Sequence, residues 1–517
     1  MSKINTNIPS LVAQSNLVKS GKELSLRFER LSTGLRINRG ADDPAGLIIS
    51  ERLRSDIQGV ESGIKNSERA SSVISTTEAA LSEVSDLLNS IKSLIVEAAN
   101  TGANSAEERA ANQLQIDSAI ESITRISNTA SFAGQKILNG TLDYLLSGVR
   151  SSAITKAQVW NASLVGAPSL QVAVDVVASA QTGGLYYNGA TTPAGVLLSA
   201  MTVEVQGNRG VQTLTFASGV PLSSVVAAVN SYTTLTGVRA QLINNNPTSG
   251  LVFKTAGYGS ESFVSVKRLN GPTSGDSLTL YKLENNTTPP DTTPFPWAAL
   301  IGANTLVQGS RDTGQDVSAL VNGNLATGRG LALSVNGPAL SVELTLSEDF
   351  ATRPDAANSI FQITGGGAMF QLGQQVNPSQ QTNMGIPSMA ASRLGGRLVS
   401  GTLQFLSSLK SGQGNSIAEN VARRDFTAAS DILDQAIQEV AILRGRLGAF
   451  ERDVLQTNVR SLQSAFENLT ASSSQIRDAD FASETSRLTR AQILQSSGTT
   501  VLGLANQQAQ QVLQLLG

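Results

Sequence analysis

The side chains that could carry out chemistry in this chain are limited by two absences: its 517 residues include no histidine and no cysteine. Without imidazole and thiol groups, the sequence has no serine–histidine pair, no zinc site of the HExxH type and no thiolate metal site. Five acids in the middle of the chain lack the spacing of a calcium-binding loop; they are Asp312, Asp316, Glu343, Glu348 and Asp349. We therefore expect no enzyme activity, no catalytic residue, no metal and no cofactor.

A second group of charged residues stands at two breaks in otherwise helical sequence, near 33–43 and 474–481. Arginines and aspartates of the two breaks could pair across them, or both breaks could be solvated loops. The residues concerned are Arg36, Arg39, Asp42, Asp43, Arg477, Asp478 and Asp480. Of these, the candidate linker contacts are Arg36, Asp42, Asp43, Asp478 and Asp480.

The overall charge is nearly balanced, with 38 Lys and Arg residues against 40 Asp and Glu residues. This balance provides no basic surface for nucleic acid. No stretch is long and apolar enough to span a membrane, and the first residues lack the apolar run of a signal peptide. We expect no nucleic-acid binding and no membrane insertion, and any export would use a route without a cleaved signal peptide.

The distribution of proline predicts the architecture. Proline costs about 3 kcal/mol inside a helix, and none occurs in 45–167 or in 388–517. Both ends of the chain can therefore be long helices around a middle that is irregular or β-rich. We predict an α+β multidomain fold in which the N- and C-terminal arms pair as an α-helical coiled-coil bundle, with β-rich outer domains inserted between them.

Apolar residues in both arms recur at helical spacing. The N-terminal arm predicts a helix over 4–35 and, behind an Asp cap at Pro44, a second helix to about Ala98. The C-terminal arm predicts an apolar stripe over 433–469 that includes Phe450 and Val454, and a terminal helix over 491–515. Such stripes require partners. The candidate self-assembly residues on them are Ile4, Ile8, Leu11, Leu31, Leu35, Leu87, Leu94, Leu447, Leu494, Val501, Val512 and Leu515.

Between 170 and 349 apolar and polar residues alternate, which predicts strands. A Pro-rich stretch over 285–296 predicts a linker between two β subdomains. The predicted domains are an inner coiled coil (1–43 and 475–517), a helical bundle (44–150 and 356–474), an outer β-rich domain with a βαβ-like insert (151–280) and a second outer β-rich subdomain (281–355).

The two arms resemble those of bacterial flagellin, the subunit of the flagellar filament. The motifs that carry the resemblance are Leu31-Ser-Thr-Gly-Leu-Arg-Ile-Asn38, Asp42-Asp-Pro-Ala-Gly46, Asp478-Ala-Asp-Phe481, Ala491-Gln-Ile-Leu494 and Val512-Leu-Gln-Leu-Leu516. The resemblance implies a secreted motility protein that forms a helical homopolymer outside the cell. It also implies that the terminal helices form the innermost coiled coil and that the middle of the chain faces outward.

The same resemblance suggests partners beyond further copies of the chain: sister flagellins, the flagellar cap, hook-junction proteins and an export chaperone. Two alternatives stay open. The chain could be a hook–filament junction protein, which shares the arms, or a filament protein whose outer domain serves mainly adhesion or host interaction.

Flagellins of many bacteria are recognised by Toll-like receptor 5 along their long N-terminal helix. The similar stretch in this chain contains Leu88, Ser90 and Leu94. Ser90 stands where recognised flagellins carry arginine, and a serine cannot replace the five-donor guanidinium group. We therefore expect weak binding to this innate immune receptor.

Overall fold

The computed structural model describes residues 6–164, 167–189, 194–271, 278–284, 295–337, 339–354, 357–399 and 402–516; within the last helix, the side chains of 509 and 512–516 lie outside the description. The described chain divides into two units, each assembled from separate segments. The first unit comprises 1–71, 370–382 and 450–517, and the second comprises 72–369 and 383–449. The predicted helical arms and β-rich middle are both present.

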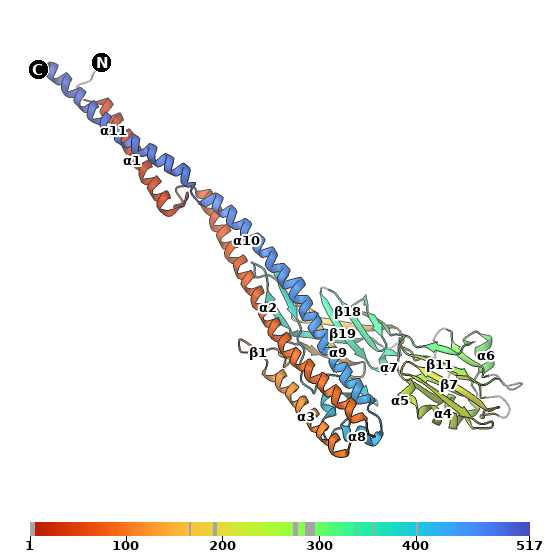
Figure 1. Ribbon diagram of the computed structural model, residues 1–517. Helices are drawn as coiled ribbons and strands as arrows, with labels where there is room; N and C mark the ends of the chain where they lie inside the picture. Colours follow the sequence, from red (N-terminus) through yellow and green to blue (C-terminus); the bar gives the residue numbers. More distant parts are fainter. Residues whose placement is uncertain are drawn as a thin grey trace. The chain divides into compact units, whose positions relative to one another are not determined.

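The first unit consists mainly of two antiparallel helix pairs (Figure 1). α1 (Ile8–Thr33) lies beside α11 (Phe481–Leu516), and the first part of α2 (Pro44–Ala99) lies beside α10 (Gln456–Arg477). Asn7 Nδ2 donates to the Ala505 carbonyl at 2.9 Å, which ties the start of α1 to the end of α11. As predicted, Asp43 caps α2, since its carboxylate accepts from Gly46 N at 2.9 Å.

A short hairpin of β21 (Ala368–Gln371) and β22 (Gln381–Met384), joined through η3 (Pro378–Gln380), contributes to the first unit. Its loop packs on the α2–α10 pair, where Asn458 Nδ2 donates both to the Ser67 hydroxyl and to the Leu372 carbonyl, each at 3.0 Å. A Cβ atom added to Gly63 would lie 3.0 Å from that carbonyl, so the close approach depends on glycine.

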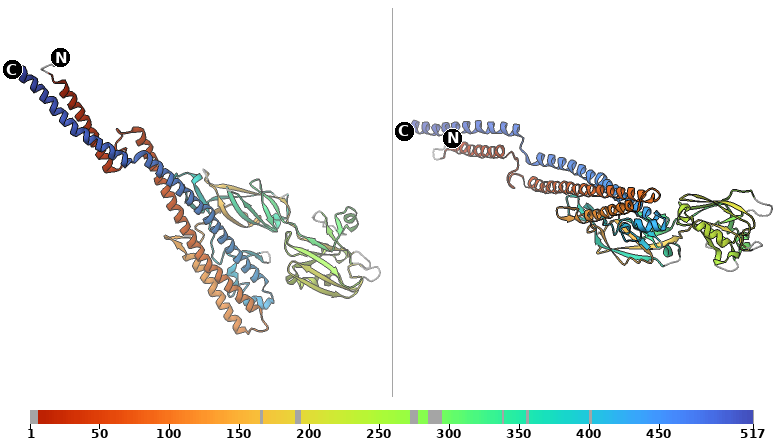
Figure 2. Two further views of the ribbon diagram at one scale, coloured as in Figure 1. Left: turned by 45° about the horizontal axis from the view of Figure 1, so that its top comes forward. Right: turned by 60° about the horizontal axis from the view of Figure 1, so that its bottom comes forward.

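In the second unit, α2 lies side by side with α3 (Ala106–Thr129) and α9 (Thr427–Ala449) (Figure 2). α8 (Ile417–Arg423) and η4 (Leu406–Leu409) complete this helical part. The buried residues of α2 recur every three or four positions; they are Ile74, Thr77, Leu81, Val84, Leu88, Ile91, Ile95 and Ala98. Leu87 and Leu94, which we predicted at the centre of the stripe, are only half-buried at its edge. A helix between two partners needs a wide apolar stripe that includes positions beside the heptad seam.

The helix that follows α9 contains a π-helical segment, η5 (Phe450–Leu455). This segment explains an error in the predicted apolar stripe. Val454, which we placed on the stripe, is 37% exposed, whereas its neighbour Leu455 is 1% exposed. A π turn adds one residue to the helical repeat, so every apolar position beyond it moves forward by one.

The first β domain is a sandwich of two antiparallel sheets, with strand orders β16-β15-β5-β20-β3 and β17-β18-β19-β4. Phe361 and Ile154 are buried between them. Its strands are β3 (Tyr144–Ser147), β4 (Ile154–Ala162), β5 (Leu170–Ala178), β15 (Ser318–Val321), β16 (Asn324–Leu325), β17 (Thr327–Arg329), β18 (Ala332–Asn336), β19 (Leu340–Leu346) and β20 (Ser359–Gly366), with the short helix α7 (Glu348–Ala351).

The inserted β domain also has two sheets, with orders β13-β12-β6-β10-β9 and β14-β11-β7-β8, and α4 contributes to its core. Its elements are β6 (Gly184–Tyr187), β7 (Met201–Gly207), β8 (Val211–Phe216), α4 (Leu222–Asn230), α5 (Thr233–Thr236), β9 (Val238–Leu242), η1 (Ile243–Asn245), η2 (Pro247–Ser249), β10 (Leu251–Thr255), β11 (Phe263–Arg268), β12 (Leu280–Leu283), α6 (Trp297–Gly302), β13 (Leu306–Gln308) and β14 (Arg311–Thr313). Two further hairpins are β1 (Ser131–Phe132) with β2 (Gln135–Lys136), and β23 (Arg397–Val399) with β24 (Thr402–Gln404).

The two β domains are nested rather than consecutive, which corrects the predicted boundary at 280. β12 and β13 lie beyond that boundary, yet they pair in one sheet with β6 and β10. The chain enters and leaves the inserted domain at Gln181 and Gln315, whose main chains exchange two hydrogen bonds of 2.9 Å. The predicted ends at 150 and 355 likewise cut β3 and β20 away from the rest of their sheet. Alternation identifies strands but not their partners. The predicted linker falls largely on 285–294, outside the described residues.

Polar contacts connect α9 to the first β domain within the second unit. The Lys156 ammonium group on β4 forms an ion pair with Glu439. About two helical turns further along α9, the Arg446 guanidinium lies 4.6 Å from the ring centre of Trp160, a cation–π contact. Both contacts join β4 to α9. Because β4 is the edge strand of the sheet β17-β18-β19-β4, this edge of the sheet faces α9.

Candidate assembly joint of the terminal helices

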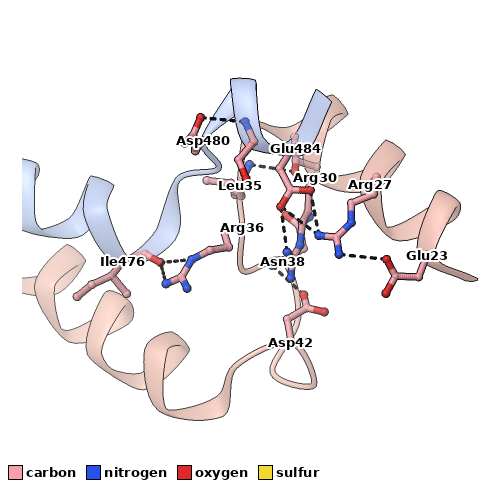
Figure 3. Close-up of polar contacts among 12 residues, drawn as sticks. Glu23, Arg27, Arg30, Leu35, Arg36, Asn38, Asp42, Ile476, Asp480 and Glu484 are labelled. Atoms are coloured by element: carbon pink, nitrogen blue, oxygen red, sulfur yellow. Dashed lines mark hydrogen bonds and ion pairs between the residues drawn. The ribbon is translucent and has the colours of Figure 1, made fainter. Parts of the chain in front are cut away.

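The two breaks between helices meet through their main chains, as Figure 3 shows. α1 ends at Gly34, whose φ of 73° lies in the left-handed region that glycine adopts readily. Arg36 N then donates to Arg477 O at 2.7 Å, and Ala479 N donates to Gly34 O at 2.9 Å. These bonds form a small antiparallel bridge between Leu35 and Asp478. The bridge connects the α1–α2 break to the α10–α11 break.

The charged residues at the breaks support this joint mainly through hydrogen bonds, rather than through the ion pairs across the breaks that were one of the two alternatives. The Arg36 guanidinium donates to the Ile476 carbonyl, with distances of 2.6 and 3.2 Å from Nη2 and Nε (Figure 3). Asp42 accepts from the backbone N–H groups of Arg39 and Asn38 at 2.9 and 3.1 Å. These two backbone hydrogen bonds lower the pKa of the Asp42 carboxyl group.

The aspartates of the second break act locally. Asp480 accepts from Ala482 N at 3.0 Å and from Ser483 N at 3.2 Å, and so caps α11. Asp478 accepts from the Ser474 hydroxyl at 2.6 Å. The first N–H groups of a helix have no partner inside it, which explains why Asp480 binds main-chain donors rather than distant arginines.

The two remaining arginines of the breaks bind glutamates that we did not select. Arg39 pairs with Glu29 at 3.0 Å, and Arg477 pairs with Glu51 at 3.2 Å. The predicted ion pairs across the breaks are therefore replaced by main-chain bonds, helix caps and these two glutamate contacts.

A buried ionic cluster lies beside the joint, between α1 and α11 (Figure 3). The Glu484 carboxylate accepts from Arg27 Nη1 at 3.0 and 3.1 Å and from Arg30 Nη1 at 3.2 Å. The side chain of Glu484 is 6% exposed, that of Arg27 9% and that of Arg30 14%. Glu23 contacts Arg27 from the solvent side at 3.2 Å. Burial alone would lower the pKa of Arg27, but hydrogen bonds with Glu484 and Glu23 raise it overall, so this arginine stays charged.

Our sequence reasoning did not select this cluster, although a signal for it was present. Glu484 begins a series with a spacing of seven that continues through Ala491, Gly498 and Ala505. Ala491 and Ala505 are buried, and a Cβ atom added to Gly498 would lie 3.3 Å from the Leu17 side chain of α1. A glutamate in the same series as small contact residues is therefore at an interface position.

The predicted self-assembly residues fall into two groups. Those on the terminal helices are exposed: Ile8 by 53%, Leu11 by 56%, Leu494 by 53% and Val501 by 53%. Leu31 and Leu35, next to the joint, are half-buried. Ile4 lies outside the described residues, as do the side chains of Val512 and Leu515.

The second group belongs to the interior of the second unit instead. Leu447 is fully buried, and Leu87 and Leu94 are half-buried on α2. Leu447 therefore has no surface to offer a second copy, which corrects its assignment as an assembly contact, whereas Leu87 and Leu94 keep part of their surface and stay predicted contacts. In the receptor-like stretch, Leu88 is fully buried and has no surface to offer a receptor, whereas Ser90 is exposed.

None of the described helices is long and apolar enough to cross a membrane. In the part of the chain that the structure describes, no three potential metal ligands of the His, Cys, Asp or Glu type come together.

Comparison with known proteins places both arms in one family. The model of the bacterial flagellin N-terminal helical region matches residues 4–143, and that of the bacterial flagellin C-terminal helical region matches residues 430–516. The chain is 30% identical over 533 residues to flagellin of Escherichia coli (strain K12), with 99% of both chains covered. It is 29% identical over 515 residues to the B-type flagellin of Pseudomonas aeruginosa and 29% identical over 538 residues to flagellin of Salmonella rubislaw, again with 99% of each chain covered.

Similarity to flagellins over the whole length does not favour the alternatives of a hook–filament junction protein or a filament protein serving mainly adhesion. Flagellins form a structural family rather than an enzyme family. The chain belongs to the bacterial flagellin family and is a structural subunit of the extracellular flagellar filament used for swimming motility.

Proposed function

We propose that this flagellin polymerises through the apolar faces that α1 and α11 leave uncovered in the single chain. The observation that supports the proposal most directly is the exposure of apolar residues on both helices. Ile8 and Leu11 of α1 and Leu494 and Val501 of α11 are each more than half exposed, although the same helices already bury residues such as Ala13 against each other. A second copy of the chain is the surface that covers them.

The energy of covering these residues favours association. Full burial of a large aliphatic side chain contributes roughly 1.5–3 kcal/mol, so covering its exposed half contributes about 1 kcal/mol. Several such residues on each copy add up along a filament, because every copy repeats the same heterologous contact. Ile4, Val512 and Leu515 extend the stripe toward both chain ends in this proposal, and Leu31 and Leu35 connect it to the joint.

The joint fixes the position of the exposed apolar faces of α1 and α11 within the first unit. Main-chain bonds between the breaks, together with the Arg36 contact to Ile476, hold the α1–α11 pair against the α2–α10 pair. Arg36, Asp42, Asp43, Asp478 and Asp480 therefore act in assembly as positioning residues, and the exposed apolar residues act as the contacts.

We extend the proposal to other flagellar components on the strength of the family resemblance. Before polymerisation the same exposed helices bind an export chaperone, and in the filament they contact sister flagellins, the flagellar cap and hook-junction proteins. Export proceeds without a cleaved signal peptide. Binding to the innate immune receptor is weak, since Leu88 is buried and Ser90 lacks a guanidinium group.

A pair of neighbouring substitutions tests the proposal. Val501→Arg leaves the soluble chain folded, because the position is exposed, but it abolishes growth from filament seeds, since a buried unpaired charge is strongly destabilising. Thr500→Arg is the matched control: Thr500 is exposed, and in the described structure its hydroxyl bonds only within its own helix, to Ser496 O. Elongation by light scattering and electron microscopy should distinguish the two variants. Normal growth of the Val501→Arg variant would contradict the proposed interface.

A further inference from the structure

We propose that Glu484, held by Arg27 and Arg30, fixes the antiparallel register of α1 and α11. This inference rests on the proposed function, because the register matters only if the two helices jointly form the polymerising surface. The three residues are positioning residues: they contact each other inside one chain and determine which exposed side chains of the two helices lie at the same level.

The rest of the α1–α11 contact specifies register weakly. After Glu484, the buried residues of α11 are the small Ala491 and Ala505, and Gly498 lies between them in the same series with a spacing of seven. A slip of one heptad, about 10.5 Å along the helix axis, brings one small residue to the place of another. Van der Waals fit along this contact therefore changes little between registers.

Glu484 is the member of the series that a slip would penalise. In the observed register its carboxylate accepts three hydrogen bonds from two guanidinium groups. After a slip of one heptad, Glu484 would face the level of Ser20 or of Gly34, neither of which carries a positive charge. Separating a buried carboxylate from its arginines is strongly unfavourable, and a buried polar residue at a helix interface is known to determine register.

The cluster contains more donors than buried acceptors. Among the described residues, Nε of Arg27 and Nε of Arg30 are buried without a hydrogen-bond partner. Glu23, the second acid in contact, is 60% exposed and touches only Arg27. Glu484 is therefore the component on which both arginines depend, and its replacement should have the largest effect on register.

The observed register aligns the exposed apolar residues of the two helices. Asn7 contacts Ala505, so counting along antiparallel helices places Leu11 at the level of Val501 and Val18 at the level of Leu494. Val18 is 53% exposed, like its counterpart. Each of these levels thus carries one exposed apolar residue from each helix. A slip of one heptad would retain only one of these two levels, because it brings Leu11 opposite Leu494 or Val18 opposite Val501.

The absence of cysteine makes the register measurable by cross-linking. Ser10 Oγ and Asn506 Oδ1 lie 2.8 Å apart, so Ser10→Cys with Asn506→Cys reports the observed register. Ser10→Cys with Thr499→Cys reports a slip of one heptad. Each pair is introduced into the full-length chain with Glu484, with Glu484→Gln and with Glu23→Gln as the matched control, and disulfide yield is measured in solution and during seeded growth.

We expect Glu484→Gln to reduce the 10–506 cross-link and to increase the 10–499 cross-link, with a loss of seeded growth, whereas Glu23→Gln changes neither. A 10–506 yield that is unchanged by Glu484→Gln and by Glu484→Ala would overturn the inference, whatever happens to growth. The proposed function fails by a different result, namely normal growth of the Val501→Arg variant with the 10–506 cross-link retained.

Discussion

The π-helical segment before α10 makes a quantitative prediction about two adjacent residues. Leu455 is 1% exposed, whereas Val454 is 37% exposed. An uninterrupted α-helix would reverse this order, because the heptad pattern that ends at Leu447 would continue through Val454. Leu455→Ala should therefore weaken α10 strongly, and Val454→Ala should leave it nearly unchanged.

The size of the effect follows from the burial of Leu455. Leu→Ala removes three carbon atoms, about 2.4 kcal/mol of transfer free energy at roughly 0.8 kcal/mol per buried methylene. The cavity that remains brings the expected loss to about 2–5 kcal/mol. For exposed Val454 the change should stay within about 0.5 kcal/mol.

Native-state hydrogen exchange is the suitable measurement, because a chain with several domains does not unfold in one step. The opening free energy of the amides in Gln456–Arg477 should fall by the amounts given above. The amides of the inserted β domain serve as an internal reference. If Val454→Ala lowers the protection of α10 more than Leu455→Ala does, the helix continues as an α-helix through this region and the assigned π turn is wrong.

Two other predictions concern the middle of the chain and the receptor-like stretch. Replacing 182–314 with a short glycine linker between Gln181 and Gln315, which already exchange two main-chain hydrogen bonds, should give a chain that still elongates filament seeds; a helical, soluble product that never elongates would show that the inserted β domain carries essential contacts between copies. Ser90→Arg should increase signalling by soluble chain in Toll-like receptor 5 reporter cells, because it supplies the guanidinium group that exposed Ser90 lacks. Equal potency of the two proteins at matched concentration would refute that assignment.

Features with local causes could be predicted from the sequence. The Asp43 cap of α2 is confirmed, and the capping box in which Ser105 and Glu108 start α3 has an equally local cause. Both depend on a side chain that satisfies backbone donors within three residues. The helical arms are confirmed for a related reason, since the absence of proline and the recurring apolar residues act within each helix.

Features that depend on distant partners were predicted less well. The nesting of the β domains is set by which strand pairs with which, and alternation in β5 or β12 contains no information about this choice. The offset between Val454 and Leu455 required a π turn that no residue type announces. Arg27 and Glu484 resembled ordinary solvated charges until α1 and α11 were placed side by side, although their positions within apolar and small-residue series pointed to an interface.

The pairing of α1 with α11 also constrains which chains can enter a filament. Asn7 and Ala505, which contact each other, are 498 positions apart in the sequence. While the protein is being synthesised, α1 is therefore complete long before its partner exists, and a chain that stops early never acquires one. Glu484, the small residues facing α1 and half of the exposed stripe are all made last. The fold thus acts as a check on completeness, since chains with a missing or damaged end lack the surface through which we propose that intact copies join.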